Sequence, residues 1–522
     1  MNNQALYLSD NDLRKIPFVD ILLSYSEIFI TELVENKVQI EIAKKLHLTL
    51  LQEMSITAEV TLQEELKSFT NNKQNIYQDF FEQTTSLLAT KYPVLDKILK
   101  NIVSNCLAHV QEIFSNFLKD SNKIAKTFSI ETNKNIIKDI DISLGDGHCG
   151  KSTALITLYD GTKLIYKPRD INVTNAYNLF INWISHKLDV QLKTVNCVSC
   201  GSYGWLEYIT YEAVNSSDEL QEYYYKAGIL LAVTLLLGSR DCHYENIIAS
   251  GRNPVLIDHE TIIQPVLSNQ YIRTLDEQHK VPSFSVLESM LIANRDTGVP
   301  LKHVGYGIKG NVESMDIEKK IINPNTIDSK RDTRFIFRKL VKENIPSYKD
   351  IHVYANNYKN SFVDGFSVTY DVFMASKEEL ISCNSPIRFF ENKKIRYVWR
   401  PTFVYFRILK YMRSASFMSN FETYKSKMHE LLSKAYEKEG FKNYKFIFDS
   451  EVKQMLNGDI PFFNLGNSDS YLAEDKSFKI FSYNCLENIK HRIDLLSIHH
   501  KSEQIEYIMK WLQINTLIKT NC

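Results

Sequence analysis

The chain has 522 residues, with 62 Lys and Arg against 62 Asp and Glu, so its formal net charge is zero. This balanced charge gives no indication of nucleic-acid or membrane-surface binding. The polar N-terminus does not resemble a secretion signal, and the longest apolar run, 229–238, is too short to span a bilayer. Eight scattered cysteines are typical of a reducing compartment. We therefore expect a cytoplasmic protein without a transmembrane segment or a nucleic-acid partner.

Apolar periodicity predicts an α+β fold in four parts. Residues 1–140 form a helical N-terminal region, because Val38, Ile42, Leu46 and Leu50 recur at helical spacing. Residues 141–215 form a small β-rich lobe, and 216–410 form a larger, mainly helical lobe. Residues 411–522 are again helical. The residues that carry chemistry lie between Gly145 and Thr402.

Residues 145–152, Gly-Asp-Gly-His-Cys-Gly-Lys-Ser, match the P-loop pattern. That motif needs a helix directly after it, whose amides hold the phosphates. Here two β-rich runs follow instead, separated by Asp160-Gly161, which predicts a hairpin. We therefore do not expect a P-loop. The glycines Gly145, Gly147 and Gly150 still allow a nucleotide to approach the backbone closely.

The second strand of this hairpin ends at Lys167. With a two-residue turn, Lys167 lies opposite Ala154, close to the glycine-rich segment. A glycine-rich loop beside a strand lysine is the arrangement by which kinases hold the phosphates of ATP. Taken alone, Lys167 favours the reading of a solvated strand lysine.

An acidic segment follows a predicted helix over 220–237, for which Gly238 is a natural stop. Two strand-like runs then flank a turn at 251–253. A hairpin centred on Arg252 sets Asn246 opposite Asp258, where both side chains reach one Mg²⁺, and Glu260 shares their face. Asp241 is the candidate acceptor of a hydroxyl proton in phosphoryl transfer, and His243 orients it or contacts the phosphate. The alternative is a polar helix cap followed by a surface hairpin.

Together these motifs resemble the lipid-kinase active site and, more specifically, the dehydratase region of class II lanthipeptide synthetases, the LanM type. The matching segments are Gly145-Asp-Gly-His148, Leu164-Ile-Tyr-Lys-Pro-Arg169, Asp241-Cys-His-Tyr-Glu-Asn246, Pro254-Val-Leu-Ile-Asp-His-Glu260 and Arg396-Tyr-Val-Trp-Arg-Pro-Thr402, with weaker support from Tyr203-Gly-Trp-Leu-Glu207 and Asp364-Gly-Phe-Ser-Val-Thr-Tyr370. The resemblance implies a lipid-kinase-like bilobal core with helical additions at both ends.

The family phosphorylates Ser and Thr of a leader-bearing precursor peptide with ATP and Mg²⁺, and then eliminates the phosphate to leave dehydroalanine or dehydrobutyrine. By resemblance, the kinase residues are Lys167, Asp241, His243, Asn246, Asp258 and Glu260, and the elimination residues are Asp146, His148, Arg396 and Thr402. Elimination needs a base for the Cα proton and a cation for the departing phosphate, which suit a histidine and an arginine. Without the resemblance, His148, Arg396 and Thr402 are ordinary loop, strand and turn residues.

Full-length members also carry a zinc-dependent cyclase domain, and its Cys and His cluster is missing here. We therefore expect no ring formation by this chain, and a separate cyclase is a candidate partner. Cys197-Val-Ser-Cys200 lacks a second ligand pair and is predicted to be structural. Two other functions remain open: a kinase that stops at phosphorylation, and a non-catalytic kinase-fold scaffold.

Overall fold

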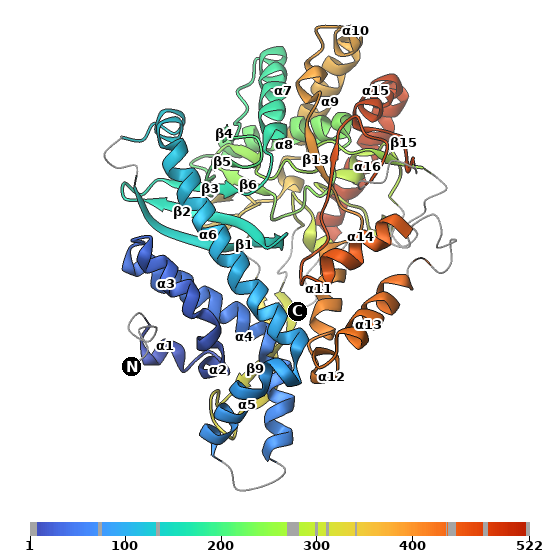
Figure 1. Ribbon diagram of the computed structural model, residues 1–522. Coiled ribbons are helices and arrows are strands. Elements are labelled where there is room, and N and C mark those ends of the chain that lie inside the picture. The colour runs from blue at the N-terminus through green and yellow to red at the C-terminus, as the bar shows by residue number, and fades with distance from the viewer. Residues whose placement is uncertain are drawn as a thin grey trace. The chain divides into compact units, whose positions relative to one another are not determined.

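The computed structural model describes residues 8–70, 76–131, 136–268, 281–297, 301–308, 313–339, 342–434, 436, 445–472 and 479–517. Helices and strands are mixed, which confirms the predicted α+β class (Figure 1). The chain forms two compact units, each built from separated segments. Unit 1 comprises 1–168, 315–338 and 398–462, and unit 2 comprises 169–314, 339–397 and 463–522. The four predicted domains stay a prediction, since these units divide the chain at other points.

Unit 1 is mostly helical, as its periodicity predicts. Its long helices α4 (Ile40–Thr70) and α6 (Pro93–Thr127) pack side by side (Figure 1). Ile42, Leu46 and Leu50 lie buried on α4, whereas Val38 precedes the helix. The remaining helices of this unit are α1 (Asp10–Leu13), α2 (Val19–Leu23), α3 (Glu27–Glu35), α5 (Tyr77–Lys91), α11 (Thr402–Tyr411), α12 (Ala415–Met418), α13 (Phe421–Ser433) and α14 (Lys445–Met455).

Three antiparallel strands of unit 1 carry the glycine-rich segment: β1 (Ile137–His148), β2 (Lys151–Leu158) and β3 (Lys163–Lys167). Cys149 and Gly150 form the β1–β2 turn with φ of 52° and 69°. Two positive φ values in a two-residue loop favour glycine and match the right-handed twist of a hairpin. A strand therefore follows the glycine-rich segment, as predicted, and not the helix of a P-loop.

The predicted register of the β2–β3 hairpin is wrong by one residue. Ala154 pairs with Tyr166, not with Lys167. The reason lies in the turn, where Leu158 donates its N–H to the carbonyl of Thr162 at 2.8 Å, so the loop has three residues. Gly161 at its end has a φ of 91°, and an added left-handed residue shifts the pairing by one.

A second hairpin of unit 1, β9 (Glu313–Ile322) and β10 (Lys330–Lys339), comes from a distant part of the chain. It is fixed to α4, since Gln63 donates to the carbonyl of Ser329 at 2.8 Å and Arg331 lies 3.4 Å from Glu59. The N-terminal helices therefore form one unit with residues that the sequence places in the kinase-like region.

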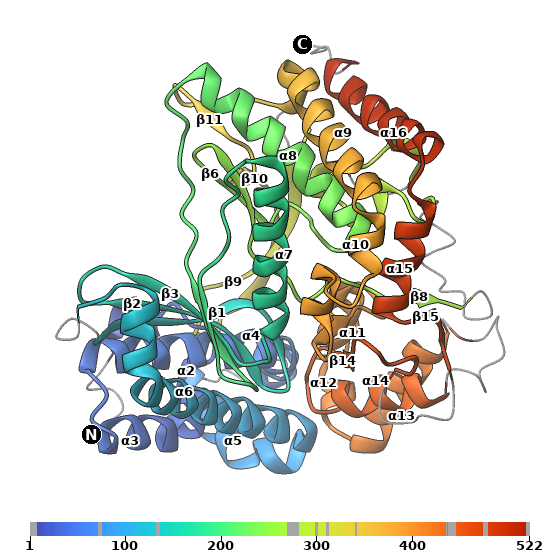
Figure 2. The same ribbon diagram turned by 90° about the horizontal axis from the view of Figure 1, so that it is seen from above.

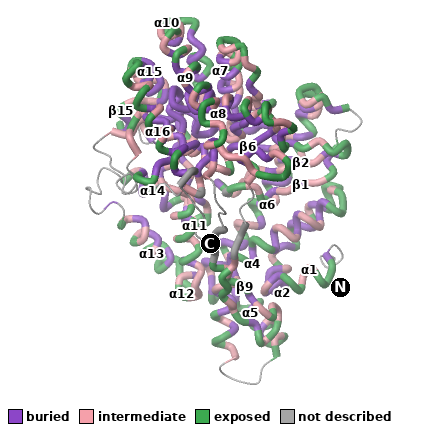
Figure 3. The backbone as a smooth tube through the Cα atoms, turned by 180° about the vertical axis from the view of Figure 1, so that it is seen from behind, coloured by how far each residue is buried: buried purple, intermediate pink, exposed green. Residues whose placement is uncertain are grey.

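The central helix of unit 2 is α8 (Ser217–Leu237), whose side chains are almost all buried from Tyr223 onward (Figure 3). It ends at Gly238, with a φ of 69°, as predicted. Figure 2 shows α9 (Lys359–Ala375) alongside it. The two backbones meet at Gly228 and Gly365, where an added Cβ would clash with the other helix. Glycine is therefore required at this crossing.

The β6–β7 hairpin of unit 2 also differs from the prediction by one residue. β6 (Ile247–Ser250) and β7 (Asn253–Leu256) join through Gly251 and Arg252, a two-residue loop. The N–H of Ile257 therefore donates to the carbonyl of Asn246 at 3.0 Å, and Asp258 lies one residue past that pair. The predicted direct pairing of Asn246 with Asp258 is wrong, because the loop has two residues and not the three of the predicted turn at 251–253. Gly251 allows this tighter turn with a φ of 56°.

The other elements of unit 2 surround this core. They are α7 (Asn172–Leu188), β4 (Cys197–Ser199), β5 (Gly204–Glu207), β8 (Val266–Leu267), β11 (Ser347–Tyr348), β12 (Ile351–His352), α10 (Lys377–Ile381), β13 (Lys394–Tyr397), β14 (Phe463–Gly466), β15 (Phe481–Tyr483), α15 (Cys485–Leu495) and α16 (Ile498–Leu517). Within the described ranges, no helix combines the length and the apolar content that a bilayer crossing needs.

Candidate functional site

Asp241, the predicted base, follows α8 in unit 2 and has a φ of 61°. Aspartate tolerates this left-handed conformation better than most residues, because its side chain can hydrogen-bond locally. Its neighbours are held firmly: the N–H of Arg240 donates to Thr261 at 3.1 Å, and that of Cys242 donates to Ser289 at 2.8 Å. A strained backbone fixed from both sides is a feature that often accompanies functional sites.

Charged neighbours converge on the Asp241 carboxyl. Desolvation raises its pKa, and the negative charges of Asp258 and Glu260 raise it further, whereas His243 and Arg396 oppose the shift. Such charge effects require groups close to one another. The structure thus brings together five predicted site residues that span 241 to 396. Asp241 keeps 41% of its side-chain surface exposed, so a substrate can reach it.

His243 lies between two carboxylates. Its Nε2 is 3.1 Å from Glu245, and its Nδ1 is 3.4 Å from a carboxylate oxygen of Asp241. Burial alone would lower the pKa of His243, but the hydrogen bond to Glu245 and the charge of Asp241 raise it to about 9. His243 is therefore a cation at neutral pH, which suits it to orient Asp241 or to contact a phosphate.

Asn246 and Asp258 offer oxygen atoms, the ligand type that Mg²⁺ prefers. The Asn246 amide nitrogen donates to the carbonyl of Asp241 at 2.7 Å, which leaves its side-chain oxygen for a cation. One Asp258 oxygen accepts the N–H of Glu260 at 3.3 Å. Over the described residues, no three His, Cys, Asp or Glu side chains are arranged to hold a metal by themselves. The residues fit a Mg²⁺ that takes its other ligands from phosphates and water.

Glu260 joins the acidic segment to the strand that carries Arg396. Its carboxylate lies 2.9 Å from Arg169, with the two side chains only 10% and 18% exposed. Its carbonyl accepts the N–H of Arg396 at 2.9 Å, and Gln264 donates to the carbonyl of Arg396 at 2.8 Å. Glu260 therefore holds β13 beside the acidic segment, and its role as a metal ligand stays a prediction.

The glycine-rich hairpin lies in unit 1. Gly145 has a φ of 71° at a register shift in β1, and Gly147 and Asp146 follow it on the same strand, with the Asp146 side chain outside the described residues. A Cβ on Gly150 would clash with Asn105 of α6. Gly150 therefore has a structural reason to be glycine, and nucleotide binding by the three glycines stays a prediction.

His148, the last residue of β1, is buried, with 7% of its surface exposed. Its Nδ1 lies 2.9 Å from the carbonyl oxygen of Ile460, and its ring centroid is 5.2 Å from that of Phe462. Lys167 is likewise buried at the end of β3. Thr402 is the first residue of α11, directly after Pro401, and not part of a turn.

Arg400, two residues before Thr402, belongs to a buried network in unit 1. It forms two hydrogen bonds to the fully buried carboxylate of Glu451, at 2.5 and 3.1 Å. Tyr405 and Tyr436 donate their hydroxyls to the same carboxylate at 2.6 and 2.5 Å, and Trp399 donates to Tyr436 at 2.9 Å. Arg400 is therefore a structural cation that fixes the segment leading to Thr402.

Cys197, the first residue of the CxxC motif, donates to Asn175 at 3.0 Å. Burial raises the pKa of its thiol to about 11. A reactive cysteine has a lowered pKa, so burial makes Cys197 a poor nucleophile, and the structural role of the motif stays a prediction.

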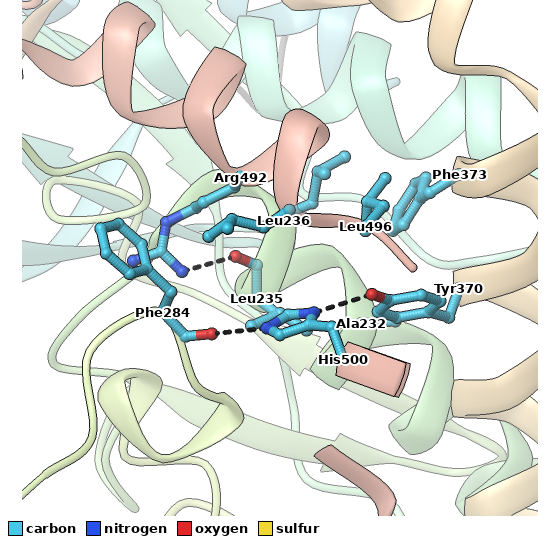
Figure 4. A pocket seen from close by; sticks show the side chains of 10 residues that line it. Ala232, Leu235, Leu236, Phe284, Tyr370, Phe373, Arg492, Leu496 and His500 are labelled. Atoms are coloured by element: carbon cyan, nitrogen blue, oxygen red, sulfur yellow. Dashed lines mark hydrogen bonds between the residues drawn. The ribbon is translucent and has the colours of Figure 1, made fainter. Parts of the chain in front are cut away.

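A small cavity of about 10 Å³ lies at the C-terminal part of α8 (Figure 4). Its polar groups are already bound: His500 contacts Tyr370 at 2.7 Å and the carbonyl of Phe284 at 3.1 Å, and Arg492 donates to the carbonyl of Leu235. Sites for small ligands are usually larger, about 300–1,000 Å³. The cavity is therefore not a candidate for the nucleotide site.

Two groups that contact predicted site residues were not predicted from the sequence, one in each unit. Arg169 carries a signal, since it ends the Lys-Pro-Arg run that matches the dehydratase region, yet its partner Glu260 lies far along the chain. The segment around Asp459 carries no motif. The carboxylate of Asp459 nevertheless accepts the N–H of Gly150 at 2.8 Å, although the two residues are 309 positions apart in the sequence.

Comparison with known proteins identifies the family of this chain. Residues 92–465 match a family model described as "Domain of unknown function (DUF4135)". The chain is also 28% identical over 438 residues to the "Lacticin 481/lactococcin biosynthesis protein LcnDR2" of Lactococcus lactis subsp. lactis. That alignment covers 79% of this chain and 44% of the relative, so the chain spans less than half of that protein's length. Because the family model matches well over half of the residues, the chain belongs to the DUF4135 family.

Proposed function

We propose that this protein modifies a lanthipeptide precursor by dehydrating Ser and Thr in two steps, phosphorylation and then elimination. The observation that carries the proposal is the convergence of charged groups on the Asp241 carboxyl: His243 lies 3.4 Å from it, and the N–H of Arg396 binds the carbonyl of Glu260 at 2.9 Å. Similarity to a protein named for lacticin 481 biosynthesis supports the substrate class. The precursor peptide, with its leader, is then the partner, and a lanthipeptide cyclase is a further candidate partner.

In the first step, the hydroxyl oxygen of Ser or Thr attacks the γ-phosphorus of ATP, and ADP leaves. Asp241 accepts the hydroxyl proton, for which its raised pKa and its partial exposure suit it. Asn246 and Asp258 would hold Mg²⁺, which when bound neutralises the phosphate charge. His243, charged at neutral pH, contacts the phosphate or orients Asp241.

The order of elements in unit 1 supports a lipid-kinase-like core. A glycine-containing β1–β2 hairpin is followed by β3, whose last residue is the buried Lys167. Kinases place a glycine-rich hairpin over the phosphates and a lysine on the third strand. We assign Lys167 to the ATP phosphates on this basis.

In the second step, a base removes the Cα proton, the Cβ–O bond breaks, and phosphate departs as the Cα–Cβ double bond forms. His148 is the proposed base, with Asp146 supporting it. Arg396 stabilises the departing phosphate, and Thr402 donates a hydroxyl hydrogen bond to it. Preorganised donors of this kind typically contribute about 10²–10³ in rate.

The proposal is tested by measuring peptide mass and ADP release in a reaction with the purified protein. The purified chain is incubated with ATP, Mg²⁺ and each of two peptides: the lacticin 481 precursor, and a short Ser/Thr/Cys-rich peptide to be sought among the genes next to its own. Loss of 18 Da per modified residue, together with ADP, is expected from the loss of one water. Stable phosphopeptide alone would reduce the protein to a kinase. Unmodified peptide in both reactions would refute the proposed enzymatic activity and favour a non-catalytic scaffold.

A further inference from the structure

The loop after α14, residues 458–462, contacts two residues at the tip of the β1–β2 hairpin, His148 and Gly150. The carboxylate of Asp459 accepts the N–H of Gly150 at 2.8 Å, and the carbonyl of Ile460 lies 2.9 Å from Nδ1 of His148. Phe462 adds a ring contact to His148. We call residues 458–462 the hairpin clasp. All of these contacts lie within unit 1.

The clasp selects one tautomer of His148. A carbonyl oxygen can only accept a hydrogen bond, so the short contact to Ile460 places a proton on Nδ1. In a neutral imidazole the other nitrogen, Nε2, then carries the lone pair. A partner on one ring nitrogen thus fixes both the tautomer and the orientation of the imidazole, as the carboxylate does for the histidine of a catalytic triad.

The clasp is itself fixed to α14. Gln454, in the last turn of that helix, accepts the N–H of Phe462 at 2.8 Å and donates to its carbonyl at 3.3 Å. Pro461 restricts the backbone between Ile460 and Phe462. These contacts attach the loop that carries the Ile460 carbonyl to the end of α14.

The same helix also holds the segment that leads to Thr402. Glu451 lies three residues before Gln454 on α14, which places the two on one side of the helix. Glu451 binds Arg400 through two hydrogen bonds, and Arg400 is two residues from Thr402. One helix therefore anchors both His148 and the start of α11.

We propose that α14 and the hairpin clasp form a positioning element for the elimination step, in which Asp459 and the Ile460 carbonyl fix the orientation and tautomer of His148 while Glu451 fixes the approach to Thr402. The proposal rests on the function proposed above. Asp459 is a positioning residue, since it contacts His148 only through the hairpin. Its loss should slow elimination and spare phosphorylation.

Asp459→Ala removes the acceptor for Gly150, and Asp459→Asn keeps a carbonyl oxygen there. The control is Asp449→Ala, which removes an exposed carboxylate of α14. Elimination is measured alone, with a synthetic phosphoserine form of the lacticin 481 precursor, and phosphorylation as ADP release. We expect Asp459→Ala to slow elimination about tenfold to a hundredfold, because a misplacement of about 1 Å can cost ~10². Asp459→Asn should restore most of the rate, and Asp449→Ala should match the wild type.

A second readout needs no peptide. NMR of the protein with ¹⁵N-labelled histidine, assigned by comparison with His148→Ala, reports which ring nitrogen carries the proton. We expect the Nδ1–H form in the wild type and in Asp459→Asn, and its loss in Asp459→Ala. An Nε2–H form in the wild type, wild-type elimination by Asp459→Ala, or equal loss in both Asp459 variants would overturn the positioning role. If the wild type modifies no peptide while NMR finds the Nδ1–H form, the proposed function is refuted, whereas the fixing of the His148 tautomer by the hairpin clasp is supported.

Discussion

Replacing Glu451 by Gln should destabilise unit 1 strongly. The Glu451 carboxylate has no exposed surface and accepts four hydrogen bonds: two from Arg400 and one each from Tyr405 and Tyr436. The amide keeps the volume but removes the charge, so the Arg400 guanidinium, 11% exposed, stays desolvated without its counter-ion. Breaking a buried ion pair from one side typically costs about 3–5 kcal/mol.

The assay is urea unfolding followed by tryptophan fluorescence. Of the four tryptophans, Trp399 is the one whose position falls in unit 1, and its indole donates to Tyr436 in the same network. The Trp399→Phe protein supplies the background signal of unit 2. We expect the free energy of unfolding seen by Trp399 to fall by about 3–5 kcal/mol in Glu451→Gln.

A double variant tests the cause. Glu451→Leu with Arg400→Met removes both charges, so it should cost clearly less than the sum of the two single changes, because neither charge is then left buried alone. A loss below about 1 kcal/mol in Glu451→Gln, the range of exposed pairs, would refute the buried-pair reasoning. Additive losses in the double variant would do the same.

Three further outcomes are expected. Asp258→Asn should lower ADP release by orders of magnitude with an unchanged circular dichroism spectrum, since it removes the charge of the proposed Mg²⁺ ligand and keeps the volume; normal turnover would rule out the proposed metal site. Arg396→Ala should accumulate phosphopeptide in a mass time course, because losing one electrostatic contact slows elimination by about 10²–10³; unmodified peptide alone would move Arg396 to the first step. Burial lowers the pKa of His47 from 6.5 to about 4, so its contribution to stability is complete above pH 6.5 and is lost as the pH falls toward 4. Between pH 7.5 and 5.5, the wild type should therefore lose about 1.4 kcal/mol more than His47→Gln in urea unfolding, and equal losses would contradict the assigned pKa.

Local features of the fold could be predicted from the sequence because their causes are local. Gly238 ends α8, and Gly161 and Gly251 mark the two hairpins, since positive φ values favour glycine. The amphipathic periodicity of α4 likewise follows from residues three or four apart. The acidic residues of unit 2 also followed from their spacing, because one helix end and one hairpin bring Asp241, Asn246 and Asp258 near one another.

Register and long-range partners were decided only by the tertiary structure. Both hairpin registers differ by one residue from the prediction, because the number of loop residues depends on φ values that the residue types alone leave open. The contact of Asp459 with Gly150 spans 309 residues and has no sequence motif. A sequence motif is a pattern of side chains, but the partner of His148 is a backbone carbonyl and the partner of Gly150 is a carboxylate outside any motif. Both groups reach these partners only when α14 packs into unit 1.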